Sequence, residues 1–241
     1  MDRKFLCSGL VITLIFALVA GCAGVHPLPG GNSNPTPPED AIRLPEPRFE
    51  SDVPVETALR DRRSVRVYAE VPLTLADIGQ VLWAAQGVTD ERGYRTTPSA
   101  GALYPLEIYV VAGDLMDLPA GIYHYQPDGH ILVRTTGGDQ REALQAAAVN
   151  QTPIGDAPAT IVICAIPERT TAKYGERGMR YVYMEAGHAS ENVYIQAVAM
   201  DLATVVIGAF DDARIGDILD LPGNTTPLYI MPVGKQVPGG G

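Results

Sequence analysis

A two-strand hairpin near the middle of the chain is the feature that most constrains its fold. Residues 122–125 and 131–134 are apolar, strand-like segments on either side of Gln126-Pro127-Asp128-Gly129, which has the composition of a reverse turn. A hairpin joins antiparallel neighbours, which argues against an all-parallel, doubly wound sheet. Four more apolar segments read as strands, at 106–112, 159–166, 204–207 and 228–233. Because these strands alternate with helical segments, we expect an α+β domain whose mixed, mainly antiparallel sheet is flanked by helices.

The clearest helix signal starts at Thr74. Thr74 can cap the helix, Asp77 stands at its third position, and Gly87 supplies a stop. Apolar residues at three- and four-residue spacing predict the longest helix over residues 184–202. Shorter helices are expected at 53–61, 140–149 and 212–219, and variable pocket-lining loops at 112–120 and 168–179.

The N-terminus has the pattern of a bacterial export signal. Arg3 and Lys4 precede an apolar run over residues 10–20, which is too short to span a bilayer. The run ends in Val-Ala-Gly-Cys22, which resembles a lipobox, so we expect residues 1–21 to be a lipoprotein signal and Cys22 to carry a lipid. The alternative is a cleaved secretory signal in which Cys22 is incidental. The lipoprotein interpretation predicts a location in the cell envelope, attached to a membrane outside the cytoplasm.

Composition divides the rest of the chain into three parts. Residues 22–48 are rich in proline and glycine and read as a tether, residues 49–236 form the domain, and residues 237–241 form a flexible tail. Cys164 lies in an apolar segment, where a lone thiol is more often a small buried hydrophobe than a nucleophile. With Cys22 acylated, no disulfide is expected within one mature chain.

The charge balance excludes nucleic acid as a partner. The formal net charge is −10, and the chain contains no basic run. Binding to phosphate backbones requires clustered Lys and Arg. The arginines of this chain are therefore expected to act locally.

The most basic block is Arg62-Arg63-Ser64-Val65-Arg66. Guanidinium groups match phosphate oxygens in bidentate fashion, and the hydroxyl of Ser64 adds a donor. In an extended segment, Ser64 and Arg66 would point to the same side. Alone, such a block is more often a solvated charge run.

Three further blocks carry weak signals of the same kind. Pro98-Ser99-Ala100-Gly101-Ala102 is a small-residue loop that permits close backbone approach, although it is also an ordinary turn before a strand. Residues 181–188 are placed at the start of the longest helix, where free N–H groups favour an electron-rich partner. Residues 227–235 form a strand that ends in the cation Lys235.

These four blocks, in this order, resemble the nitroreductase-like FMN-dependent oxidoreductases over almost the whole domain. The resemblance is closest to the branch that contains the azoline dehydrogenases of peptide-modifying systems. It is carried there by segments similar to Tyr174-Gly175-Glu176-Arg177, Glu185-Ala186-Gly187-His188 and Gly208-Ala209-Phe210-Asp211-Asp212.

The resemblance implies that FMN is the cofactor and places it on particular residues. Arg62 and Ser64 would hold the phosphate and ribityl chain, with Arg63 acting through its backbone, and Arg66 would lie by the pyrimidine edge. Ser99, Ala100 and Gly101 would line the flavin ring from a second subunit, and Ala186 and Gly187 would offer backbone N–H groups to it. Lys235 would reach the phosphate. Pro98 and Gly208 are also assigned to cofactor binding. The family also implies a homodimer.

The expected activity is transfer of hydride or electrons between flavin N5 and a small organic or peptide-borne substrate. Tyr104, Tyr181 and His188 are candidate proton donors, each more often a packing or lining residue. Glu191 and Ala102 depart from the family pattern, in which Gln and Asn are common at these positions, and they leave the substrate open.

The sequence leaves two alternatives to an enzyme that NAD(P)H reduces. The domain could be a binding or sensing module in a flavin fold, without turnover. It could also take electrons from its substrate, because an exported enzyme has no nicotinamide pool comparable to that of the cytoplasm, which leaves NAD(P)H as donor open. A metal site is not expected, since no histidine has ligand spacing with another ligand, and a serine hydrolase is not expected, because Ser99 lacks the G-x-S-x-G context.

Overall fold

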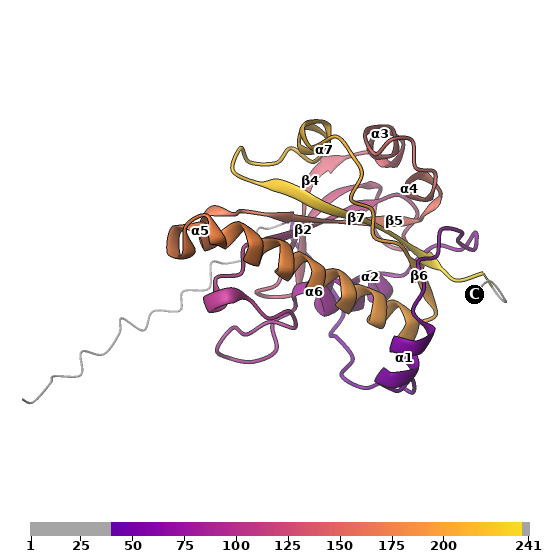
Figure 1. Cartoon of the computed structure of the whole chain (residues 1–241). Coiled ribbons are helices and arrows are strands. Elements are labelled where there is room, and N and C mark those ends of the chain that lie inside the picture. The colour runs from indigo at the N-terminus through magenta and orange to yellow at the C-terminus, as the bar shows by residue number, and fades with distance from the viewer. Residues whose placement is uncertain (1–39, 238–241) are drawn as a thin grey trace, which may run out of the picture. The chain divides into compact units, whose positions relative to one another are not determined.

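The computed structural model describes residues 40–237, which contain one sheet flanked by helices (Figure 1). The sheet has seven strands in the spatial order β1-β4-β3-β2-β5-β7-β6. All six pairs of neighbouring strands are antiparallel. The parallel element of the expected mixed sheet is confined, in the described part, to an isolated bridge between Leu73 and Leu115. The strands are β1 (Ile42–Arg43), β2 (Leu106–Ala112), β3 (Gly121–Gln126), β4 (Ile131–Gly137), β5 (Ala159–Ala165), β6 (Leu202–Thr204) and β7 (Thr226–Lys235).

The expected hairpin is formed by β3 and β4. Gln126 pairs with Ile131, so the turn lies where the sequence placed it. The backbone at Gly129 has a φ of 96° and that at His130 a φ of 50°, which is the left-handed region that tight reversals use. The α+β class is therefore confirmed.

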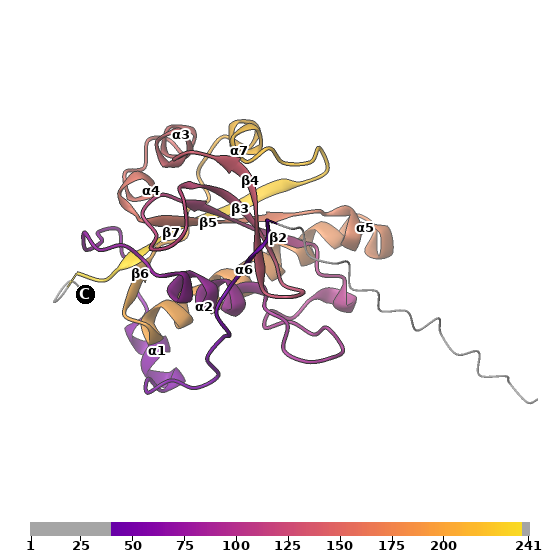
Figure 2. The ribbon, with the colours of Figure 1, turned by 180° about the vertical axis from the view of Figure 1, so that it is seen from behind.

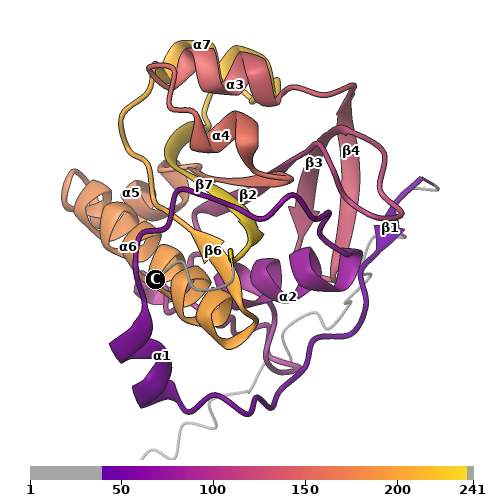
Figure 3. The ribbon, with the colours of Figure 1, turned by 90° about the vertical axis from the view of Figure 1, so that its right-hand side faces the viewer.

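Helices cover both faces of the sheet, as Figures 1 and 3 show. One face packs against α2 (Leu75–Gln86) and α6 (Arg177–Ala199), which lie side by side (Figure 2). The other face packs against α3 (Arg141–Ala147), α4 (Pro153–Asp156) and α7 (Asp212–Leu219). The two remaining α-helices are α1 (Val55–Asp61) and α5 (Glu168–Tyr174).

Strand alternation separates the two large core clusters, one on each face of the sheet. In β2, Ile108 and Val110 belong to the cluster under α2 and α6, whereas Tyr109 and Val111 belong to the cluster under α3 and α7. Cys164 of β5 is fully buried in the second cluster, and burial raises the pKa of its thiol. A neutral buried thiol is inert, which agrees with its interpretation as a small hydrophobe.

The capping prediction for α2 is confirmed. Thr74 accepts from the backbone of Asp77, while the Asp77 carboxylate accepts from the backbone N–H of Thr74 at 2.9 Å. The N–H of Gly87 closes the helix on the carbonyl of Trp83. All of these contacts are local, which is why the sequence could specify them.

Two expectations about the second half of the domain are wrong. Residues 168–179 are not a loop but α5 and the first turn of α6, and α6 begins at Arg177 instead of near residue 184. Gly175, with a φ of 59°, ends α5. A Cβ on Gly178 would lie 2.8 Å from the Cα of Thr171, so the close packing of α5 against α6 requires glycine there. This glycine therefore lies inside α6 because of its contact with α5 and does not end a helix.

The folded part also begins earlier than residue 49. The segment β1, within the predicted tether, pairs with β4 and forms one edge of the sheet, and Leu44 is buried in the core. The predicted signal at 1–21, the lipidation site Cys22 and most of the tail lie outside the described residues. Within residues 40–237, no helix is long and apolar enough to cross a membrane.

Candidate functional site

The arginine block runs from the end of α1 along β6 and is attached to α6. The N–H of Val65 donates to the carbonyl of Thr204 at 2.9 Å. The hydroxyl of Ser64 lies 2.9 Å from that of Tyr194 on α6, and the Arg62 guanidinium stands 5.0 Å above the Tyr194 ring. The block is therefore held in place by α6 and is not a free surface run.

The cations of this block are weakly neutralised. The Arg63 side chain donates to the carbonyls of Arg60 and Arg62, and its expected backbone contact with a cofactor stays a prediction. Arg62 is 4.0 Å from the Glu191 carboxylate, a loose contact. Arg66 and Ser64 are both exposed, and within residues 40–237 Arg66 has no carboxylate partner. An unpaired guanidinium on an acidic chain is available to an anionic ligand.

A loop of free backbone donors lies next to the arginine block. It follows β6, and the N–H of Val206 donates to the hydroxyl of Tyr194 at 2.8 Å, so the same tyrosine holds both the block and the loop. In the described part of the chain, the N–H groups of Gly208, Ala209 and Phe210 have no hydrogen-bond partner. Consecutive free N–H groups favour an electron-rich ligand.

A cavity of about 300 Å³ opens beside this loop, between α6 and the start of β7. Ala186 on its wall and Tyr194 lie about 12 Å apart along α6, at a helical rise of about 1.5 Å per residue. One helix thus brings a cation cluster and an aromatic-lined cavity within reach of a single ligand. The cavity is lined by Tyr183, Ala186, Gly208, Phe210, Asp212, Thr226, Pro227, Leu228 and Tyr229.

The role expected for the N–H groups of Ala186 and Gly187 is wrong. Both residues lie in the interior of α6, where each N–H is bonded to the carbonyl four residues earlier and cannot donate to a ligand. Ala186 contributes only its side chain to the cavity wall. The free donors that sequence reasoning missed are those of Ala209 and Phe210, and the motif containing Gly208 was the only available signal.

The loop that contains Pro98, Ser99 and Ala100 packs onto the chain's own α5 and α6. Gly101 has a φ of 67°, and a Cβ there would lie 2.8 Å from the Tyr174 hydroxyl and 3.0 Å from the Lys173 ammonium. The positive φ would strain a side chain at this position, and the ends of Lys173 and Tyr174 would have to move to make room for it. Lys173 and Tyr174, which sequence reasoning did not single out as a pair, thus form a phenol and an ammonium beside the loop. Contact of Ser99, Ala100 and Gly101 with a partner's flavin remains a prediction.

The three candidate proton donors lie in different surroundings. Tyr104 ends the loop, with the Arg95 guanidinium 4.6 Å from the centre of its ring. Tyr181 packs edge-on against Tyr174, with ring centres 5.2 Å apart. His188 is exposed on α6. None of the three lines the cavity between α6 and β7.

Lys235 is engaged elsewhere. Its ammonium lies 2.9 Å from the Asp77 carboxylate at the start of α2. Burial opposes ionisation of Asp77, but Lys235 and the hydrogen bonds from Thr74 outweigh it and lower the pKa of this carboxyl. A role at the phosphate would require Lys235 to leave this pair, and that role stays a prediction.

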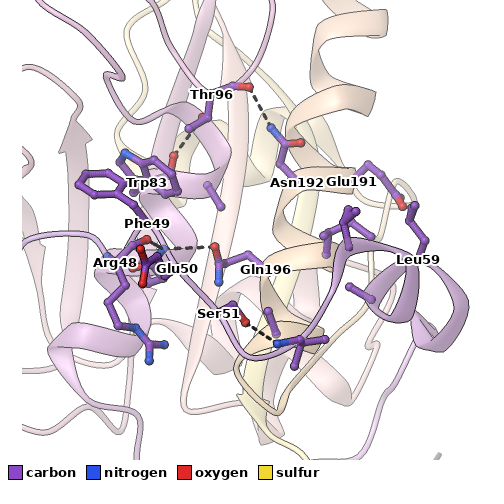
Figure 4. A pocket seen from close by; sticks show the side chains of 17 residues that line it. Arg48, Phe49, Glu50, Ser51, Leu59, Trp83, Thr96, Glu191, Asn192 and Gln196 are labelled. Atoms are coloured by element: carbon purple, nitrogen blue, oxygen red, sulfur yellow. Dashed lines mark hydrogen bonds between the residues drawn. The ribbon is translucent and has the colours of Figure 1, made fainter.

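A second, larger cavity of about 580 Å³ is a groove between α1, α2 and α6 (Figure 4). Phe49 packs edge-on against Trp83, with ring centres 5.5 Å apart, and 78% of Phe49 is exposed. Leu59 on α1 is 56% exposed at the other end of the groove. Among residues 40–237, no three His, Cys, Asp or Glu side chains converge as a metal site would require.

Comparison with known proteins identifies the family. The profile of the Nitroreductase family matches residues 59–235. A Methanocaldococcus jannaschii protein named as a nitroreductase is 46% identical over 198 residues, which is 82% of this chain and 98% of that protein. The microcin B17-processing protein of Escherichia coli is 27% identical over 143 residues, or 57% of this chain and 53% of that protein.

Solved structures agree on the fold. A Ralstonia eutropha crystal structure named as a nitroreductase superposes with a TM-score of 0.73 at 28% identity, covering 83% of this chain and 90% of that chain. A chain of the Escherichia coli microcin synthetase complex superposes with a TM-score of 0.64 at 23% identity, covering 83% of this chain and 79% of that one. The chain belongs to the Nitroreductase family and is an oxidoreductase of that family.

The double attachment at Tyr194 can be tested by removing its hydroxyl. Tyr194→Phe keeps the ring under Arg62 but leaves Ser64 and the N–H of Val206 without their partner. We expect the free energy of unfolding, measured by urea denaturation, to fall by about 1–3 kcal/mol. Tyr94→Phe, at an exposed tyrosine, is the matched control and should change stability by less than about 0.5 kcal/mol. Equal effects of the two changes would show that the Tyr194 hydroxyl does not anchor the site.

Proposed function

We propose that this protein is an FMN-dependent oxidoreductase of the nitroreductase or dehydrogenase type. The observation that carries the proposal is the shared anchoring of two complementary features by Tyr194: the exposed cations of the arginine block and the free N–H groups after β6. Arg62 and Ser64 fit a phosphate and a hydroxylated chain, and the N–H groups of Gly208 and Ala209 fit the electron-rich edge of a ring.

The chemistry present agrees with what a flavin site needs. Bound FMN supplies hydride or electron transfer at ring N5. The chain's own residues bind and orient: Arg66 stabilises negative charge near the ring, and Tyr183 and Phe210 line an aromatic cavity. A protein environment that presents cations and N–H donors favours the anionic form of a reduced ring.

The substrate class follows from the relatives only as a proposal. The curated relatives include proteins named for processing microcin B17 and trifolitoxin, which supports a peptide-borne substrate beside a small organic one. NAD(P)H as electron donor stays open, since an exported enzyme could instead take electrons from its substrate. The alternative function is a flavin-fold binding or sensing lipoprotein without turnover.

Flavin binding has a direct test. Residues 23–241 should purify yellow or take up FMN stoichiometrically, and Arg66→Ala should weaken FMN binding about 10- to 100-fold because a charge-assisted contact is lost. Arg134→Ala, at an exposed arginine of β4, is the control and should leave affinity unchanged.

The outcomes distinguish FMN binding, the role of Arg66 and turnover from one another. A colourless protein that ignores added FMN refutes it, whereas an Arg66→Ala variant with normal affinity removes only the role of Arg66. Repeated anaerobic reduction and reoxidation of the bound flavin by a donor and an acceptor supports the enzyme, and binding without turnover supports the sensing alternative.

We further propose a homodimer that uses the groove between α1, α2 and α6. The exposed apolar side chains of Phe49, Val55 and Leu59 gather along it, and apolar surface of this kind favours burial against a partner. A second copy of the chain presents the same groove, as an isologous interface requires.

The interface is tested by placing a charge in it. Leu59→Asp should raise the dimer dissociation constant by at least about tenfold, because it removes a buried leucine from each side and adds two charges. Analytical ultracentrifugation measures the change. Val149→Asp, at an apolar residue that is 71% exposed after α3, is the control and should leave the mass at that of two chains. A monomeric wild type would refute the dimer.

We also propose that the protein is anchored in the cell envelope through a lipid on Cys22. The pattern of an apolar run, small residues and cysteine supports this. Cys22→Ser in the full chain should move the protein from the membrane fraction to the aqueous phase in detergent partition, because the acyl chains supply the membrane affinity. Cys7→Ser, within the predicted signal, is the control. Unchanged partition of Cys22→Ser would favour the secretory alternative.

A further inference from the structure

Glu185 is a buried carboxylate outside both the arginine block and the lining of the cavity between α6 and β7. It lies on α6, beside the cavity residue Ala186, and only 3% of it is exposed. Its Oε2 accepts a hydrogen bond from the Ser99 hydroxyl at 2.6 Å, and its Oε1 has no partner in the described part of the chain. A buried carboxylate with one free oxygen is costly, so its presence calls for a role.

The contact made by Glu185 continues into the small-residue loop. The hydroxyl of Ser99 donates to Glu185 and accepts from the backbone N–H of Tyr104 at 2.9 Å. The Ser99 hydroxyl therefore joins the two ends of the loop, and its O–H group points toward α6. Ser99 is not free to donate to a ligand through its hydroxyl, as a direct cofactor contact would need.

The loop needs such support because its backbone is strained. Gly101, Ala102 and Tyr104 have φ values of 67°, 53° and 44°. For residues other than glycine this left-handed region costs on the order of 1–2 kcal/mol each, and it persists only where surrounding contacts impose it. Arg169 bonds the carbonyl of Tyr104 at 3.0 Å from outside, and Glu185 holds the loop from inside through Ser99.

We propose that Glu185 is a positioning residue that acts through Ser99 to hold the loop from Pro98 to Tyr104 in the conformation that receives the cofactor. The inference rests on the proposed flavin function of that loop. Glu185 itself touches no reacting atom. It sets the loop's shape and therefore the affinity of the site.

The electrostatic surroundings of Glu185 make this role measurable. Burial raises the pKa of Glu185 to about 7, against the hydrogen bond from Ser99 and the field of Arg95, which both favour ionisation. Arg95 is the charged side chain whose field reaches it within residues 40–237. Tyr181 and His188, one turn away on α6, are its titratable neighbours on the same helix.

A raised carboxyl pKa has a defined effect on stability. The unfolded chain ionises Glu185 near its ordinary pKa of 4.5, whereas the folded chain resists ionisation until about pH 7. The contribution of this group to stability is therefore fully present below pH 4.5 and is lost as the pH rises toward 7. A variant without the Glu185 carboxyl should not lose stability in this way as the pH rises.

The decisive experiment compares Glu185→Leu, Glu185→Gln and Ser99→Ala in residues 23–241. Glu185→Leu should weaken FMN binding by about tenfold while making the protein more stable than the wild type above pH 7, a split that a merely structural residue would not show. Glu185→Gln keeps a neutral acceptor for Ser99, so it should keep most of the affinity and lose the pH dependence of stability.

The path through Ser99 is tested by the double variant. Ser99→Ala combined with Glu185→Leu should bind FMN no more weakly than the weaker single variant, because both changes break the same chain of contacts. Hydrogen exchange of the Tyr104 amide should be faster in both single variants, and this measurement does not need FMN.

The outcomes keep the two proposals apart. Unchanged Tyr104 exchange in Glu185→Leu, or affinity losses of the two single variants that add, would overturn the role of Glu185 even if the flavin binds. A wild-type protein that binds no FMN would refute the proposed function, and faster Tyr104 exchange would then still assign Glu185 to loop positioning.

Discussion

Packing of α6 across the sheet is the contact on which the rest of the structure depends. The side of the helix that faces the core carries small and branched apolar residues, and Ala189, Val193 and Ala197 are almost completely buried. Small side chains let the helix lie close to the strands, and a close-packed interface permits little rotation about the helix axis. The direction of every polar side chain on α6 follows from this contact.

Three polar attachments use that fixed rotation. Tyr194 holds the arginine block and the loop after β6, and Glu185, on another side of the same helix, holds the loop from Pro98 to Tyr104 through Ser99. α6 thus holds three segments that lie far apart in the sequence. On our proposal, Glu185 is kept in the core because it orders a strained loop, and its burial lowers the stability of the fold above pH 7.

Much of the fold was predictable because its signals are local. The capping pair of Thr74 and Asp77, the turn before His130 and the apolar strand ending at Ala112 each depend on neighbours within a few residues. The start of α6 was not predictable in this way. Glycines at 175, 178 and 187 resemble helix stops in the sequence, yet Gly178 is required by the contact with α5 and Gly187 lies within the continuous helix.

The sequence by itself determined the chemistry available to the protein: an arginine-serine block on an acidic chain, a small-residue loop and an N-terminus patterned for export. Only the tertiary structure decided how that chemistry is used. The N–H groups of Ala186 and Gly187 lie inside a helix, and the N–H groups after β6 have no partner among the described residues. The hydroxyl of Ser99 donates to Glu185. The physical reason is that a hydrogen-bonding group is available to a ligand only where packing leaves it without an internal partner, and packing is set by contacts between distant segments.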